Sequence, residues 1–166
     1  MLQFMESLQA MGWATALRES ALAYPIILSL HLVGIGLFGS MVAMTDFRIL
    51  GWAAKDRRIA DIHGQLRPYK HLGLTLVASC GLLLGISKAA IYWPNPYFRG
   101  KLTLLLLVGV HALIFRNGVY GNLEALDAAP RVPGKAKLAA VLSLLMWVGL
   151  VTCGRMIGYW EPESEF

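Results

Sequence analysis

The chain has 166 residues, of which 57% are hydrophobic and 15% are charged, and its formal net charge is +5. Soluble domains are about 45–50% apolar and about 25% charged, so this composition excludes a disordered, collagen-like or disulfide-rich secreted chain and disfavours a soluble globule. Because the basic residues cluster between long apolar blocks, the positive charge indicates membrane topology and no nucleic-acid partner.

Residues 1–20 are too short and too mixed to cross a bilayer. Leu2, Met5, Leu8 and Leu17 recur at roughly helical spacing, which predicts an amphipathic helix lying on the membrane surface. A signal peptide is disfavoured because no positive charge precedes Arg18.

Four apolar blocks are long enough to cross a bilayer, which takes about 20 residues of helix. The predicted spans are residues 21–45, 71–93, 100–120 and 137–160. Joined by short connections, they predict an all-α fold, an up-and-down bundle of four transmembrane helices in a single membrane domain, residues 1–166.

The connections predict the orientation of the bundle. Ten basic residues follow the first and third spans: Arg48, Lys55, Arg57, Arg58, Arg67, Lys70, Arg116, Arg131, Lys135 and Lys137. The opposite side carries Arg18, Arg99 and Lys101 and an acidic tail with Glu161, Glu163 and Glu165. The positive-inside rule therefore predicts a bacterial inner-membrane protein with both termini in the periplasm.

Four ionisable side chains interrupt the spans: His31, Lys88, His111 and Arg155. Such residues are costly in hydrocarbon and mark functional sites by default. His31 and His111 each lie ten residues from the outer end of their span, or about 15 Å deep. We therefore expect the two imidazoles to face each other and to bind one haem iron from both sides. Arg155 and Lys88, in the outer half, would pair with the haem propionates.

Simpler interpretations stay open beside this one. Each histidine taken alone is as well explained by a hydrogen bond between helices. Zinc or copper is disfavoured because no further ligands complete a coordination set at that level. Cys80 and Cys153 lie inside apolar blocks and give no metal motif.

A second polar group lies near the predicted inner surface. His63 and His71 precede and open the second span, and Asp46 and Arg48 directly follow the first. The two histidines fit ordinary interfacial residues, a second haem or a quinone pocket. Asp46 and Arg48 fit an ion pair at a helix end, or a proton or quinone contact.

No GxSxG, Walker or HExxH motif is present, and no catalytic triad can be assembled. Any chemistry would have to come from a bound cofactor.

Several stretches resemble a known pattern: Tyr24-Pro25, then residues 29–34 (SLHLVG), 45–51 (TDFRILG), 143–147 (SLLMW) and 153–155 (CGR). Together they resemble an uncharacterised family of small bacterial four-helix membrane proteins, and the likeness covers nearly the whole chain. This resemblance implies the fold and the length, and it brings no established activity.

A more distant resemblance is to the membrane domain of copper-resistance protein D and to HemJ-type protoporphyrinogen oxidase. It rests on His31 with the glycines at 34–39, and for the HemJ type also on Lys88, Lys101 and His111. The HemJ pattern around the fourth helix is not evident. The resemblance implies binding of b-type haem and does not extend to the oxidase activity.

These observations predict a small b-type cytochrome, an electron-transfer protein or subunit rather than a stand-alone enzyme. It would move electrons between a periplasmic redox protein and the quinone pool. The alternatives are a cofactor-free subunit of a larger membrane complex, a haem-dependent porphyrinogen oxidase and a copper-handling membrane protein. A chain this small is expected to work with a partner or as a homo-oligomer.

Overall fold

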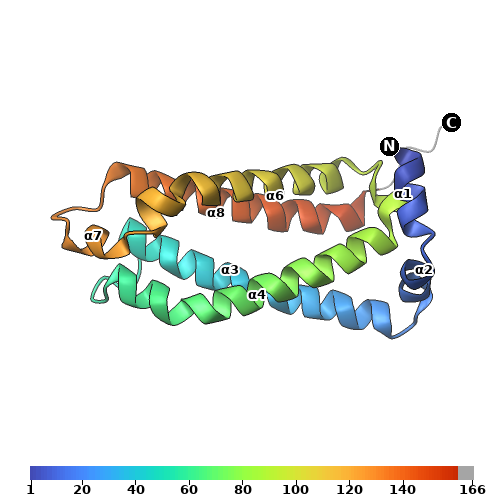
Figure 1. Ribbon diagram of the computed structural model, residues 1–166, viewed down its shortest axis with the longest axis horizontal. Helices are drawn as coiled ribbons and strands as arrows, with labels where there is room; N and C mark the ends of the chain where they lie inside the picture. The colour runs from blue at the N-terminus through green and yellow to red at the C-terminus, as the bar shows by residue number, and fades with distance from the viewer. Residues whose placement is uncertain (161–166) are drawn as a thin grey trace.

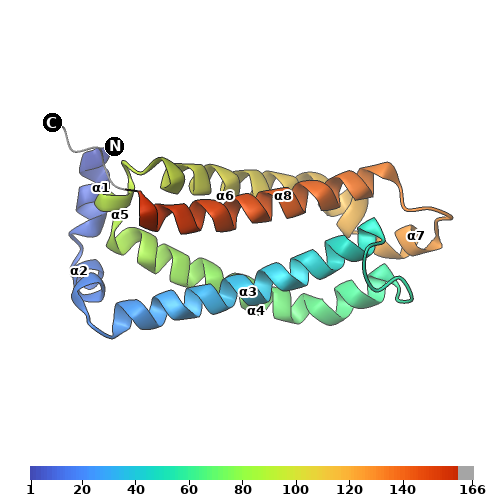
Figure 2. The ribbon, with the colours of Figure 1, turned by 180° about the vertical axis from the view of Figure 1, so that it is seen from behind.

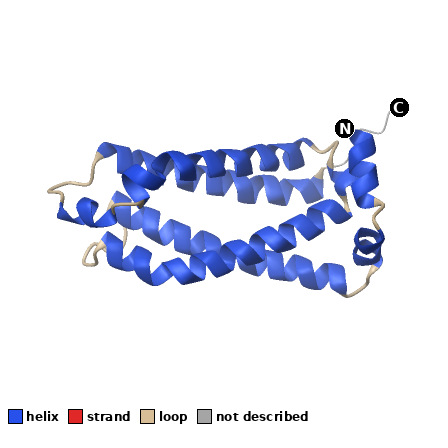
Figure 3. Cartoon of the chain, viewed as in Figure 1, coloured by secondary structure: helices blue, strands red, loops and turns tan. Residues whose placement is uncertain are grey.

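The structure, a computed structural model, describes residues 1–160 apart from the side chains of Arg116 and Tyr120. The predicted acidic tail, with Glu161, Glu163 and Glu165, lies outside the described residues. Within residues 1–160 the chain forms helices and turns and no strand (Figure 3).

Four long helices run up and down the molecule (Figure 1). They are α3 (Ala23–Leu50), α4 (Ile59–Ser87), α6 (Pro96–Phe115) and α8 (Gly134–Met156). All four are long and apolar enough to cross a membrane, with the third such segment running from Pro96 to Val119. The predicted all-α membrane bundle is therefore confirmed, and the chain is a multi-pass membrane protein.

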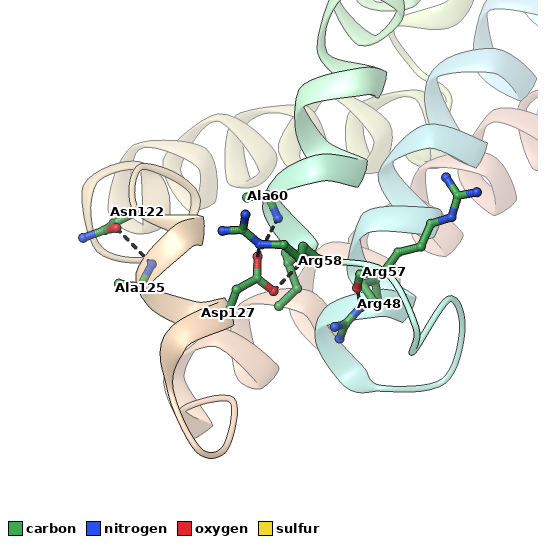
Figure 4. A network of polar contacts seen from close by, with 8 residues as sticks. Arg48, Arg57, Arg58, Ala60, Asn122, Ala125 and Asp127 are labelled. Carbon is green, nitrogen blue, oxygen red and sulfur yellow. Dashed lines mark hydrogen bonds and ion pairs between the residues drawn. The ribbon is translucent and has the colours of Figure 1, made fainter.

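The helix α4 begins at Ile59, twelve residues before the predicted start of the second span at His71. Its first turn is capped from a distant part of the chain. The two carboxylate oxygens of Asp127, on the short helix α7 (Leu123–Ala128), accept hydrogen bonds from the backbone N–H groups of Ile59 at 2.8 Å and Ala60 at 2.9 Å (Figure 4). A carboxylate at a helix N-terminus satisfies otherwise unpaired donors, so α7 fixes where α4 starts.

The helix α6 also begins earlier than predicted, at Pro96 rather than residue 100. The Asn95 side-chain oxygen accepts hydrogen bonds from the backbone N–H of Tyr97 at 2.9 Å and of Phe98 at 3.4 Å. Asparagine before a proline is a strong start signal for a helix. The Asn95 amide also donates to the Ile157 carbonyl at 3.2 Å, which ties this start to the end of α8.

The helix α3 continues to Leu50, so Asp46 and Arg48 lie inside it rather than after it. It ends at Gly51, whose φ of 78° is the left-handed conformation that glycine adopts at helix ends. The Trp52 N–H donates to the Phe47 carbonyl at 2.8 Å and closes this cap.

Two short helices, α1 (Leu2–Gln9) and α2 (Gly12–Glu19), lie across the end of the bundle opposite α7 (Figure 2). The sequence predicted one helix here, but the chain turns at residues 10 and 11. The turn lets Gln9 accept a hydrogen bond from the Ala90 N–H of α5 (Ala89–Tyr92) at 3.0 Å. It also lets Arg18 donate to the Ser87 carbonyl at 3.0 Å. Gln9 and Arg18 thus satisfy backbone groups at the junction between α4 and α5.

A cluster of small and aliphatic side chains closes the α7 end of the bundle. It contains Ile49, Ile59, Val119, Leu123, Leu126, Ala136, Ala139 and Ala140. Val119 lies in the π-helical turn Arg116–Tyr120 that extends α6. Both ends of the bundle are therefore covered by short helical segments, with the single turn Ile157–Tyr159 completing the far end of α8.

The four long helices form two layers, α3 with α4 and α6 with α8 (Figure 1). Small residues allow close approach within and between the layers. A Cβ on Gly34 would lie 3.2 Å from the Val77 backbone of α4, and one on Gly39 would lie 2.3 Å from the Trp147 ring of α8. The α4 and α6 backbones, by contrast, have almost no close approach. This loosely packed side of the bundle is called the α4–α6 seam.

Candidate functional site

A cavity of about 440 Å³ lies inside the bundle toward the α7 end and reaches the α4–α6 seam. We call it the α4–α6 cavity. Its size falls within the range of about 300–1,000 Å³ that is typical of small-molecule sites. Its polar lining residues are Thr45, Asp46, His63, Lys70, His71, His111 and Ser143, and its apolar ones are Phe38, Val42, Val108, Ala112, Met146 and Trp147.

His111 reaches the cavity from α6 and is held by α8. Its Nε2 atom lies 3.0 Å from the Ala139 carbonyl oxygen, and its ring packs against Phe115 with 4.9 Å between ring centroids. Because a carbonyl oxygen only accepts, Nε2 donates this hydrogen bond, and in the neutral ring Nδ1 then carries the lone pair. A backbone carbonyl that fixes one ring nitrogen is the usual support of a metal-binding histidine.

His71 lies on α4, on the other side of the seam from His111, and is exposed. Both side chains line the same cavity although their helices hardly touch. The cavity therefore places two imidazoles on opposite walls of one space.

Lys70 joins α4 to α3 inside the cavity. Its ammonium donates a hydrogen bond of 2.7 Å to the Thr45 hydroxyl, which in turn donates to the Met41 carbonyl at 3.1 Å. Asp46 also lines the cavity and is only 2% exposed. The lining therefore combines a cation, an acid and three histidines with aromatic side chains.

His31 does not lie at the level of His111, in contrast to the equal depth that the sequence predicted. His111 shares the cavity with α3 residues from Phe38 to Asp46, which follow His31 by seven to fifteen residues, or about 10–22 Å along the helix. The early start of α6 and the later start of α3, at Ala23, explain the difference: His111 is the sixteenth residue of α6, whereas His31 is the ninth residue of α3.

His31 instead packs between α3 and α4, and it is 8% exposed. A Cβ on Gly81 would lie 2.9 Å from its Cε1 atom. Its Nδ1 atom has no hydrogen-bond partner among the described residues. The ammonium of Lys101, on α6, lies within electrostatic range of the ring. An α4 glycine therefore lies against the edge of the His31 ring, and the role of His31 as a haem ligand stays a prediction.

Lys88 and Arg155 lie at the end opposite α7, as their positions predicted, and therefore far from the α4–α6 cavity. The Lys88 ammonium lies 4.4 Å from the Tyr24 ring centroid, and the Arg155 guanidinium contacts Tyr159. Tyr24 and Tyr92 share a hydrogen bond of 3.1 Å, and burial together with this bond raises the pKa of the Tyr92 hydroxyl. The structure thus gives Lys88 and Arg155 aromatic partners and does not bring them to the cavity.

Of the predicted inner group, His63, His71 and Asp46 line the cavity and Arg48 does not. The Arg48 side chain donates instead to the Arg57 carbonyl and supports the connection between α3 and α4 (Figure 4).

Sequence reasoning missed Lys70, Thr45 and Trp147 as lining residues. Lys70 stands beside His71 and one turn after Arg67, but a second span that begins at His71 leaves Lys70 in the connection before it. The helical spacing of residues 63, 67, 70 and 71 was the signal that would have placed them on one face.

No cluster within residues 1–160 brings three or more histidine, cysteine, aspartate or glutamate side chains close enough to hold a metal ion. Bis-histidine haem needs only two protein ligands. The α4–α6 cavity offers two histidines and a largely apolar wall.

The fold and the cavity define a four-helix membrane protein with a histidine-lined space toward one end of its bundle. The chain belongs to a family of unknown function, DUF6644, whose model matches residues 21–160. The predicted membership of an uncharacterised family is thereby confirmed. No curated protein and no solved structure shows significant similarity to the chain.

Proposed function

We propose that this protein is a small electron-transfer protein of the bacterial inner membrane that holds b-type haem in the α4–α6 cavity. One observation carries the proposal: His71 and His111 line a single cavity from two helices that do not pack against each other. Two facing helices are the usual source of cofactor ligands in a bundle. The axial pair is therefore His71 and His111 rather than His31 and His111.

The lining supports this role in three ways. The carbonyl of Ala139 fixes the tautomer of His111, which orients a ligand before binding. Phe38 and Trp147, whose ring centroids lie 5.6 Å apart, give an aromatic wall for a flat ring. Lys70 supplies a cation for an acidic substituent. Bound haem would supply reversible one-electron chemistry, and the chain would hold it away from water.

A quinone is the second candidate for this cavity. The seam faces the bilayer, since His71 and Ala112 on its two sides are exposed, and a lipophilic ring could enter there. Lys70 would then donate to a carbonyl oxygen of the quinone, and Asp46 would accept from a hydroxyl of the reduced quinol. The quinone pool thus remains the proposed redox partner within the membrane, and a periplasmic protein the proposed partner outside it.

The test is a reduced-minus-oxidised absorption spectrum of protein purified in detergent, with haem measured as the pyridine haemochrome. We expect a reduced b-type α-band that His71→Ala and His111→Ala each abolish. His63→Ala is the matched control because it removes a third lining histidine, and His31→Ala tests the pairing expected from sequence. Both should keep the band.

Other results would redirect the proposal. Loss of the band in His31→Ala with the helical circular dichroism unchanged would restore the His31–His111 pairing. Protein that lacks haem after expression with ample haem supply would overturn the cytochrome. Extraction of quinone from that protein would then favour the second candidate.

A further inference from the structure

A second space, of about 410 Å³, lies along α4 beside the α4–α6 cavity, with which it shares Phe38, His63, Lys70 and His71. We call it the α4 hollow. It is lined by Phe38 of α3 and by His63, Arg67, Lys70, His71 and Leu74 of α4. The five α4 residues recur at helical spacing and form one stripe on the helix surface.

The α4 hollow changes character along its length. His63 and Arg67 lie toward the α7 end, while Leu74 lies about 16 Å further along α4, toward the bilayer centre. Its α7 end is therefore basic, and its far end is apolar. A ligand that matches it has an anionic head and a hydrocarbon tail.

The length of α4 places the basic end in the headgroup layer. Its 29 residues span about 43 Å, which exceeds the hydrocarbon thickness of about 30 Å. We assign the excess to the first turns of α4, which carry His63 and Arg67, because the uncharged apolar run of α4 begins only at Leu72. Phosphate groups of lipids lie at this depth.

Arg67 has no acidic partner within the described part of the chain. The ion pairs found there join Arg18 to Glu19 and Arg58 to Asp127. Arg67 is exposed and takes part in no hydrogen bond between described residues. A guanidinium binds phosphate with two parallel hydrogen bonds. Arg67, at the headgroup level, can therefore supply both donors to a lipid phosphate.

We propose that the α4 hollow is a binding site for an anionic phospholipid of the leaflet on the α7 side. Arg67 and His63 hold the phosphate, and an acyl chain lies along Leu74 and Phe38. A neutral quinone ring would leave the guanidinium unpaired, and free phosphate would leave the apolar end empty. Basic pockets beside membrane helices recognise anionic lipids in this way.

The experiment is native mass spectrometry of the detergent-purified protein, titrated with phosphatidylglycerol or with phosphatidylcholine of the same chains. We expect at least fivefold tighter binding of phosphatidylglycerol by the unaltered protein. Arg67→Gln should remove this preference. Arg57→Gln is the matched control, because it deletes the same charge at the same end outside the hollow, and it should keep the preference.

Three results would overturn the proposal. They are equal binding of the two lipids, equal loss of preference in Arg67→Gln and Arg57→Gln, and saturable binding of inorganic phosphate that displaces the lipid. Arg67→Lys, which keeps a cation, should retain most of the preference and shows that the site rather than the fold is altered. The lipid is read by mass and the haem by absorption, so this proposal and the cytochrome fail independently.

Discussion

At the scale of single residues, glycine decides where the two layers of the bundle touch. Gly39 of α3 lies directly under the Trp147 ring of α8, where a Cβ would come within 2.3 Å of ring atoms. Trp147 in turn lines the α4–α6 cavity and packs edge-on against Phe38. The absence of one methyl group therefore sets the position of an aromatic wall of the cavity.

This contact predicts the effect of a single methyl group. Gly39→Ala should destabilise the protein by about 1–3 kcal/mol, because the ring and both helices must shift to accommodate it. Gly36→Ala is the control, because Gly36 lies one turn away on the same helix with nothing within 4 Å of the added Cβ. It should leave stability unchanged or raise it slightly, since alanine favours helix. Thermal unfolding in detergent measures both, and an equal loss in the two variants would contradict the packing argument.

At the scale of helices, the bundle could be predicted from the sequence, and the helix starts could not. Apolar content defines four spans whatever the tertiary contacts are. The start of α4, however, depends on Asp127, which lies 68 residues away from Ile59, and no local pattern reports such a cap. The start of α6 at Pro96 moved His111 away from the level of His31. Together with the α3 start at Ala23, this places His111 seven residues further into its helix than His31.

The same cap gives a prediction for the α7 end. Asp127→Ala should destabilise the protein by about 1–2 kcal/mol, because the Ile59 and Ala60 N–H groups lose a charged acceptor at a helix N-terminus. Glu124→Gln, also on α7 but exposed and outside this contact, is the matched control. Hydrogen exchange read by mass spectrometry should show faster exchange confined to the first turn of α4 and to α7. Unchanged exchange there would mean that the hydrophobic cluster alone fixes the start of α4.

At the scale of the whole molecule, both proposed sites lie toward one end, and their meaning depends on which side of the membrane that end faces. The basic residues gather there: the connection from α3 to α4 alone holds Lys55, Arg57 and Arg58. The end with α1 and α2 has fewer basic residues, namely Arg18, Lys88, Arg99, Lys101 and Arg155. The positive-inside rule therefore predicts that the α7 end faces the cytoplasm. The lipid of the α4 hollow would then belong to the inner leaflet.

Thiol labelling tests this orientation directly. In a background with Cys80 and Cys153 changed to serine, a cysteine is placed either at Ala10 or at Asp56, both exposed and at opposite ends of the bundle. A membrane-impermeant maleimide should label Ala10→Cys in intact spheroplasts and Asp56→Cys only after the membrane is opened. The reverse pattern would place the haem and the lipid near the outer surface, and the exchange partner outside the membrane would then meet the α7 end. The labelling result therefore decides which end of the molecule is searched for its redox partner.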